Sequence, residues 1–189
     1  GERVLYPLKK RFSFTQLAAF KKCPLQYKFE HIYRIPKFGS FNKSFGQSVH
    51  LALQRIMDLH LKRKEQGQGS LFEGVAERKS AKGLLVSHDE AMEIYELSWI
   101  DEWYESREQH DEFKKKGMQA INHLVSQYGE EAPSIKYVER PFTLVLGQHS
   151  IKGKVDRIDE LPDGSFAIFD YKTGAVKEEL SADDKEQLY

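Results

Sequence analysis

The sequence predicts an α/β domain in which a small β-sheet is flanked by helices. Three observations support this fold class. Apolar residues recur at helical spacing over much of 13–128, and the pattern then changes to short apolar runs between turn residues over 135–172. The 189 residues, 40% of them apolar, are enough for one hydrophobic core. We therefore expect a single domain over 1–189, with a lead-in at 1–10 and a helical insertion over about 66–134.

Three helices are expected in the N-terminal third. Ser13 and Gln16 have the spacing of a capping box, and the helix that they begin is interrupted by Pro24. That proline suits the first turn of a second helix, which Pro36 closes. Apolar residues then recur at helical spacing over about 44–64, which predicts a long, partly buried helix.

The predicted insertion begins with a flexible break at 66–70, "QGQGS". Mixed signals over 71–86 indicate irregular structure or a short helix. A second capping box at Ser87 predicts a helix that extends to Trp103. Another helix is expected over about 108–128, where a glycine and a proline follow.

The last third predicts a three-stranded antiparallel meander. Segments 135–147 and 149–160 pair across the Gly147-Gln148 turn, and "LPDGS" returns the chain into a strand over 166–172. A final helix is expected from Ser181 to the end of the chain.

The chain is neutral overall, but its charge is unevenly distributed. Residues 1–50 contain ten Lys or Arg against Glu2 and Glu30, a net charge of +8, which leaves −8 for the remainder. Aromatic residues are interleaved with these cations: Phe12, Phe14, Phe20, Tyr27, Phe29, Tyr33 and Phe38. Such a segment suits phosphate neutralisation and base stacking, so DNA is an expected partner. The alternative is a solvated helix pair whose aromatic residues lie in the core.

The absence of certain sequence features predicts where in the cell the protein acts. No run approaches the roughly 18 apolar residues of a membrane span, and the N-terminus has no signal-peptide pattern. The single cysteine cannot form an internal disulfide, which fits a reducing compartment. We expect a cytoplasmic protein without a membrane partner. Because the chain stops within a helical pattern, we expect it to be part of a larger protein.

Two carboxylates and a lysine occur within the apolar strands. Asp170 and Lys172 are two residues apart, so they share one face of their predicted strand. A carboxylate in an apolar setting needs an ion pair or a metal ion, and a simple Asp170–Lys172 pair is one answer. Asp156 on the preceding strand adds a second acid that one lysine cannot neutralise. Oxygen ligands of this kind favour Mg²⁺ or Mn²⁺ over zinc.

An Asp on one strand followed by Asp-x-Lys on the next resembles the PD-(D/E)xK nuclease superfamily. Four further segments extend the resemblance over nearly the whole chain: "SFTQLAAFKKCPLQYKF", "GQSVH", "GKVDRID" with "DYKTG", and "QLY". Together they are similar to the RecB-type nuclease domain found at the C-terminus of superfamily 1 DNA helicases and in AddB-like proteins. The resemblance implies a restriction-endonuclease-like core, with a small mixed β-sheet flanked by helices and a helical insertion. It also implies a superfamily 1 helicase domain in the same chain or complex.

The resemblance also implies roles for individual residues. His50, Asp156, Asp170 and the main-chain carbonyl of Tyr171 correspond to the ligands of Mg²⁺ or Mn²⁺, and Lys172 assists the attacking water or the scissile phosphate. Asp156, Asp170 and Lys172 are thus the expected catalytic residues. Each side chain also has an ordinary interpretation: a core histidine for His50, an ion pair for Lys172, and surface pairing with a neighbouring basic residue for Asp156.

Other positions match the family's supporting motifs. Gln187 and Tyr189 are expected to contact DNA or the water network of the site, although they also fit an ordinary helix face. Gly46 allows backbone or substrate to approach its helix closely. Glu139 occupies a region where relatives have an acid near the site, but it is not among the predicted site residues.

Cys23 matches a cysteine that in AddB-like nucleases joins three others to hold a [4Fe-4S] cluster. One thiolate cannot hold a cluster. The cofactor is therefore expected only if three more cysteines follow Tyr189 in the parent protein, and a buried cysteine at a helix start is the favoured interpretation.

The expected function is that of a metal-dependent deoxyribonuclease, with exonuclease action as the expected mode, serving DNA repair or recombination within a helicase-nuclease. The alternative is a catalytically silent module that binds DNA or supports the structure of such a complex. A third possibility is that truncation has left this segment inactive.

Overall fold

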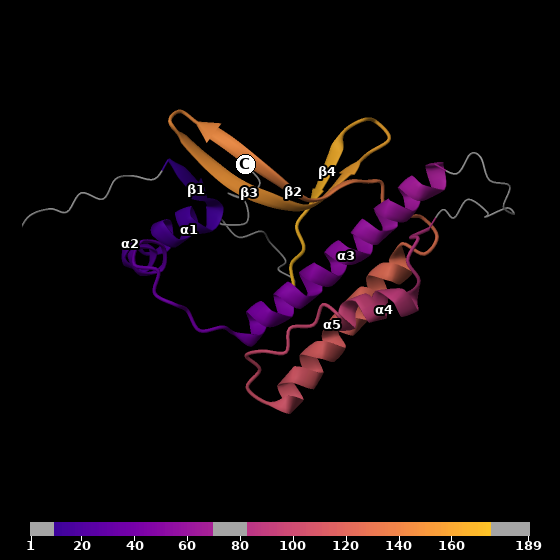
Figure 1. The fold of residues 1–189 in the computed structure, drawn as a ribbon, viewed down its shortest axis with the longest axis horizontal. Helices are drawn as coiled ribbons and strands as arrows, with labels where there is room; N and C mark the ends of the chain where they lie inside the picture. The colour runs from indigo at the N-terminus through magenta and orange to yellow at the C-terminus, as the bar shows by residue number, and fades with distance from the viewer. Residues whose placement is uncertain (1–9, 70–82, 175–189) are drawn as a thin grey trace, which may run out of the picture.

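The chain folds into a mixed α/β structure in which a sheet lies on one side of a long helix and two helices lie on the other (Figure 1). This computed structural model describes residues 10–69 and 83–174. The expected α/β class with a small mixed sheet flanked by helices is confirmed.

The elements follow one another in the order helices, then strands, apart from one short strand at the start. The helices are α1 (Phe14–Lys22), α2 (Pro24–Tyr27), the π-helical turn η1 (Lys28–Ile32), α3 (Phe41–Gly69), α4 (His88–Glu96) and α5 (Arg107–Gln127). The strands are β1 (Arg11–Ser13), β2 (Ile135–Leu146), β3 (His149–Glu160) and β4 (Phe166–Phe169).

Strand β3 is the centre of the sheet. β2 pairs antiparallel along one edge of β3, with Leu146 opposite His149, as the turn at Gly147 requires. β4 pairs antiparallel with the second half of β3. β1 pairs parallel with its first half, so the sheet is mixed. The predicted meander is confirmed, and β1 is an addition that three residues were too short to predict.

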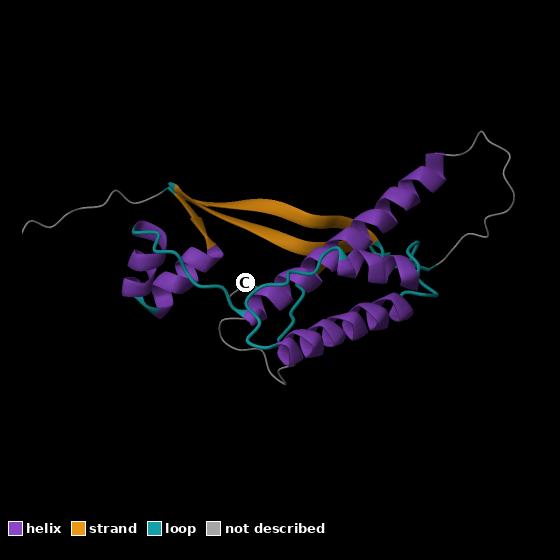
Figure 2. Cartoon of the chain, turned by 60° about the horizontal axis from the view of Figure 1, so that its bottom comes forward, coloured by secondary structure: helices purple, strands orange, loops and turns teal. Residues whose placement is uncertain are grey.

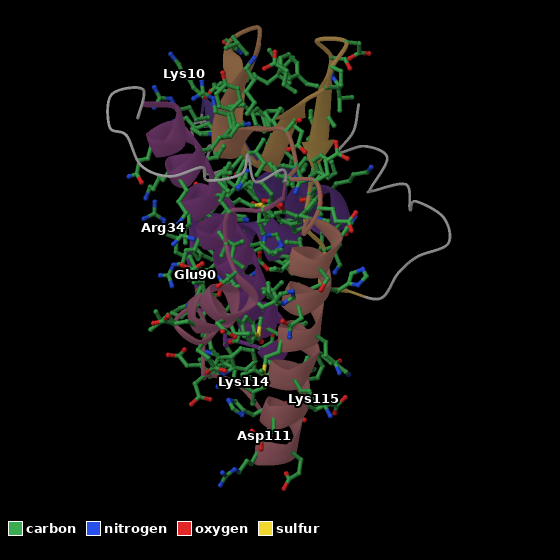
Figure 3. The ribbon with its side chains drawn as sticks, turned by 90° about the vertical axis from the view of Figure 1, so that its right-hand side faces the viewer. Lys10, Arg34, Glu90, Asp111, Lys114 and Lys115 are labelled. Atoms are coloured by element: carbon green, nitrogen blue, oxygen red, sulfur yellow. The ribbon has the colours of Figure 1, made fainter. Side chains whose placement is uncertain are left out.

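The hydrophobic core lies between α3, α4 and α5. Its fully buried members are apolar side chains spaced along the inner faces of these helices: Ala52, Ile56, Ala91, Tyr95 and Ile121. Figures 1 and 2 both show α3 between the sheet and the α4–α5 pair. Charged side chains such as Asp111 and Lys115 extend outward from α5 (Figure 3). The amphipathic pattern therefore places α3 where one face packs on helices and another approaches the sheet.

Both predicted capping boxes are present. The hydroxyl of Ser13 accepts the N–H of Gln16, whose side chain accepts the N–H of Ser13 in return. Ser87 and Glu90 make the same reciprocal pair at the start of α4. The second predicted helix is a short α-helix that continues as the π-helical turn η1.

The expectation that the helix from Ser87 reaches Trp103 is wrong, because α4 ends at Glu96. Arg55 of α3 donates to the carbonyl oxygen of Leu97 at 3.0 Å and to the hydroxyl of Ser98 at 3.0 Å. These contacts satisfy groups at the helix end from outside the helix. Ser98 in turn donates to the carbonyl of Ile94 at 2.6 Å, so a local residue and a residue of another helix both contribute to the end of α4.

Helix α3 is longer than predicted at both ends. It begins at Phe41 and continues to Gly69, so the expected flexible break at 66–70 is helical as far as Gly69. Each glycine in a helix costs only about 1 kcal/mol relative to alanine, which a long helix tolerates. Among the described residues, no helix is long and apolar enough to cross a membrane.

The last predicted strand is shorter than expected. β4 ends at Phe169, so Asp170 and Lys172 follow the strand. Phe166 and Ile168 on this strand are themselves exposed. The expectation that Asp170 lies in an apolar environment is therefore wrong. The final helix expected from Ser181 lies outside the described residues.

Candidate active site

A cleft opens between the first turns of α3 and the middle of strands β2 and β3. It has a volume of about 600 Å³. Its walls include two of the predicted site residues, a glycine predicted to permit close approach, and two charged residues of the sheet: His50, Asp156, Gly46, Glu139 and Lys154. The cleft therefore brings together α3 and the sheet at the predicted site.

His50 and Asp156 are adjacent in the cleft, although 106 positions separate them in the sequence. Nδ1 of His50 lies 3.5 Å from Oδ2 of Asp156. The Asp156 side chain is only 13% exposed. Asp156 pairs with neither Lys154 nor Arg157, because those cations pair with Glu139 and Asp159. Asp156 is therefore not a surface partner of its basic neighbours in this structure.

Tyr171 connects the Asp-x-Lys segment to this pair. Its main-chain N–H donates to Oδ2 of Asp156 at 2.7 Å. Its ring packs edge-to-face against His50, with centroids 6.0 Å apart. Burial raises the pKa of the Tyr171 hydroxyl, and nearby Arg157 opposes that rise. The ring and the backbone of Tyr171 therefore hold the segment 170–172 against β3 and α3.

Arg157 supports this arrangement from within the protein and was missed by the sequence analysis. Its side chain is 2% exposed. It donates to the hydroxyls of Tyr128 at 2.9 Å and Tyr171 at 3.4 Å, and its Nε lies 3.0 Å from Oδ1 of Asp159. Its guanidinium also lies 4.0 Å from the ring centre of Phe169. Arg157 thus ties the residues on both sides of Asp170 to the sheet.

Asp170 and Lys172 pair with each other at the rim of the site. Nζ of Lys172 lies 2.6 Å from Oδ2 of Asp170, and the two side chains are 62% and 55% exposed. This contact is the simple Asp170–Lys172 ion pair that the sequence allowed as one alternative. An exposed pair of this kind contributes only about 0–1 kcal/mol, so the other charges of a site readily compete with it.

Glu139 lies opposite Asp156 on the neighbouring strand. The register pairs Val138 with Arg157 and Arg140 with Val155, which leaves Glu139 and Asp156 facing each other. Like charges in directly opposite positions destabilise a sheet unless each is compensated. Here Lys154 forms an ion pair with Glu139, and His50 lies beside Asp156.

The backbone of Glu139 is in the left-handed region, with φ of 53°. A non-glycine residue in that conformation costs about 1–3 kcal/mol and occurs most often at functional sites. The sequence contained a signal for this residue: counting outward from the Gly147-Gln148 turn places position 139 opposite position 156. Glu139 is therefore a site residue that the register of the predicted hairpin could have identified.

The donor chemistry of the site fits a hard divalent cation. Carboxylate oxygens with one imidazole nitrogen suit Mg²⁺ or Mn²⁺. Within 10–69 and 83–174, however, no three His, Cys, Asp or Glu side chains are grouped as they would be around a metal ion. His50 and Asp156 lie together, whereas Asp170 is turned toward Lys172. The structure thus brings together two of the three predicted side-chain ligands.

Gly46 lies where α3 meets the segment after Lys172. A Cβ atom at this position would lie 3.2 Å from Oγ1 of Thr173, which is tighter than an ordinary contact. The close approach expected at Gly46 is made by the chain itself, at the residue next to Lys172.

Replacing Gly46 with leucine is expected to displace Thr173 and to lower the nuclease activity that the sequence motifs predict by about tenfold or more, because small misplacements of catalytic groups cost up to about 10²-fold in rate. Gly67→Leu in the same helix is the matched control, since nothing lies within 4 Å of its Cβ position. The control should keep the wild-type rate and gain up to about 1 kcal/mol of stability. Rates from a gel assay and thermal unfolding of both variants check this, and equal rate losses in the two would contradict it.

The remaining predicted positions are not part of the described site. Gln187 and Tyr189 lie outside the described residues. Cys23 is a free, half-buried cysteine between α1 and α2. It lines a separate apolar pocket with Leu25, Phe29 and Ile35.

The mixed sheet and its flanking helices are those of a restriction-endonuclease-like fold, and the cleft between α3 and the sheet is lined by His50, Glu139 and Asp156 among other residues. The model of the PD-(D/E)XK nuclease superfamily matches residues 11–189. The chain therefore belongs to the PD-(D/E)XK nuclease superfamily, whose members are generally phosphodiester hydrolases that typically use divalent metals. A comparison with curated proteins gave no match.

Proposed function

We propose that this domain is a Mg²⁺- or Mn²⁺-dependent deoxyribonuclease that hydrolyses phosphodiester bonds. The observation that supports this most directly is that His50 of α3 and Asp156 of β3 meet in one cleft, where the main-chain N–H of Tyr171, just after β4, donates to Asp156. Packing alone gives no reason to place a largely buried carboxylate beside a histidine, because removing a charged group from water costs free energy.

Each residue has a proposed role. The cation would be held by His50, Asp156, Asp170 and the carbonyl of Tyr171. When bound, it would supply activation of a water molecule and positive charge for the phosphate. Lys172 stabilises the negative charge that develops on the scissile phosphate. Glu139, which faces Asp156, adds a further carboxylate to this wall of the cleft.

The finer proposal follows the resemblance of the motifs to RecB-type domains. We place this domain in a helicase-nuclease of DNA repair or recombination, with a superfamily 1 helicase as its partner and exonuclease action as its mode. The basic N-terminal segment, with a net charge of +8, supports a DNA partner because phosphate contacts supply most of the affinity for nucleic acid. Cytoplasmic location is part of the same proposal.

The test is a cleavage assay on the parent protein with single- and double-stranded DNA, in Mg²⁺, Mn²⁺ or EDTA. We expect cleavage that requires the metal and falls by at least about 10²-fold in Asp156→Asn, because this change removes a charged group from the reacting centre. Asp163→Asn, in the exposed turn between β3 and β4, is the matched control and should retain full activity. Intact DNA under every condition would support the catalytically silent alternative.

A further inference from the structure

We infer that Phe38 and Trp103 form a stacking site for one unpaired base beside the cleft, so that this domain acts on single-stranded nucleic acid. The inference rests on the proposed nuclease function and names its substrate class. Phe38 is 92% exposed and Trp103 51% exposed. Their rings meet edge-to-face, with centroids 6.4 Å apart.

The position of Trp103 is fixed by the structure around it. Its backbone has φ of 69°, a conformation that a bulky residue rarely adopts. Gly39 packs directly under the indole, where a Cβ atom would lie only 2.2 Å from Nε1 of Trp103. Trp103 is half-exposed although an unusual backbone conformation and a close glycine contact fix its ring. The described fold gains little from this arrangement, which points to an external binding partner.

Both aromatic residues are close in sequence to the walls of the cleft. Phe38 lies three residues before α3, whose first turns contribute Asn42, Lys43 and His50 to those walls. Trp103 follows Ile100, which lines the cleft and donates its N–H to the hydroxyl of Ser48 at 2.9 Å. Three or four residues of chain span at most about 14 Å, so a strand with a nucleotide on the aromatic pair can reach the cleft with a neighbouring phosphate.

The exposed charges near Phe38 and those near Trp103 differ in sign, which favours a nucleic-acid strand that runs past Phe38. The chain around Phe38, here called the Phe38 side, carries exposed Arg34, Lys37 and Lys43, of which Lys37 pairs with Glu30. The Trp103 side carries Asp101, Glu102 and Glu105, of which Asp101 pairs with His110. Phosphates are attracted to the first side and repelled by the second. The backbone would therefore lie along the segment 34–43, with its base turned toward Trp103.

The geometry distinguishes single strands from duplexes. In a duplex both faces of each internal base are covered by neighbouring bases, so an aromatic side chain has no free face to contact. An unpaired base has a free face, and stacking one base on an aromatic side chain strengthens binding by about 5- to 150-fold. The pair should therefore increase affinity for single strands and leave affinity for duplexes nearly unchanged.

The experiment measures binding of the parent protein to a labelled oligothymidylate and to a blunt duplex, by fluorescence anisotropy in EDTA so that no cleavage occurs. We expect Phe38→Ala and Trp103→Ala each to weaken oligothymidylate binding about tenfold, and to change duplex binding by less than about twofold. Phe38→Tyr keeps the ring and should bind as the wild type does. Phe166→Ala, an equally accessible aromatic on β4, is the matched control and should change neither affinity.

Wild-type affinity for oligothymidylate in both alanine variants, or an equal loss on the duplex, would overturn the inference. Thermal unfolding of each variant shows whether a loss of binding comes from a loss of folding. The proposed nuclease function and the proposed stacking site can each be contradicted without the other. A protein that shows the expected binding but never cleaves DNA contradicts the proposed function, whereas one that cleaves DNA and ignores both substitutions contradicts only the stacking site.

Discussion

Replacing Arg157 with methionine is expected to lower the free energy of unfolding by about 3–5 kcal/mol, the usual result of removing one partner from a buried ion pair. Methionine keeps much of the volume but leaves Asp159 buried without its cation. Burial already raises the pKa of Asp159, and the adjacent guanidinium opposes that rise. The variant also loses the hydrogen bonds to Tyr128 and Tyr171. Chemical denaturation at neutral pH measures the loss.

Two further measurements show that the buried charge is the cause. Without Arg157 the folded pKa of Asp159 rises further above its unfolded value, so the folded state favours the protonated acid. The stability from that protonation is present at low pH and is lost as the pH rises through the folded pKa. The defect of Arg157→Met should therefore be smaller at acidic pH than at neutral pH. Adding Asp159→Asn should restore part of the stability, and a double variant no more stable than the single one would contradict this account.

The hairpin and most helices could be predicted because their signals are local. Capping residues at Ser13 and Ser87 lie next to the helices that they begin, and the turn at Gly147 fixes which residues face each other in β2 and β3. The same register places Glu139 opposite Asp156. Local signals therefore determine most of the elements. The register that they set also identifies Glu139 as the residue opposite Asp156.

The missed features depend on partners far away in the sequence. α4 ends where Arg55, 42 residues earlier, binds the carbonyl of Leu97. The buried side chain of Arg157 donates a hydrogen bond to Tyr128 at the end of α5, 29 residues earlier in the sequence. No periodicity in the sequence records such contacts. The exposure of Asp170 was missed for the related reason that β4 is too short to include it.

Removing the two charges of the Asp170–Lys172 pair one at a time is expected to separate metal binding from cleavage. Asp170→Asn should weaken Mn²⁺ binding by at least about tenfold, because it replaces a charged oxygen ligand with a neutral one, and cleavage should fall with it. Lys172→Met should lower cleavage by about 10²–10³-fold, the typical effect of removing one group that stabilises transition-state charge. Titration calorimetry with Mn²⁺ and a cleavage assay measure the two quantities.

The ion pair at 2.6 Å determines the sign of the metal effect in Lys172→Met. Because this lysine neutralises Asp170 in the metal-free protein, its removal leaves the carboxylate free, and Mn²⁺ affinity should stay the same or rise by up to about fivefold, the worth of an exposed pair. Lys136→Met breaks a comparable pair with Glu160 at 2.8 Å, away from the cleft, and should alter neither quantity. A parallel loss of metal affinity and cleavage in Lys172→Met would mean that the lysine positions Asp170, whereas a selective loss of cleavage assigns it to the reacting phosphate.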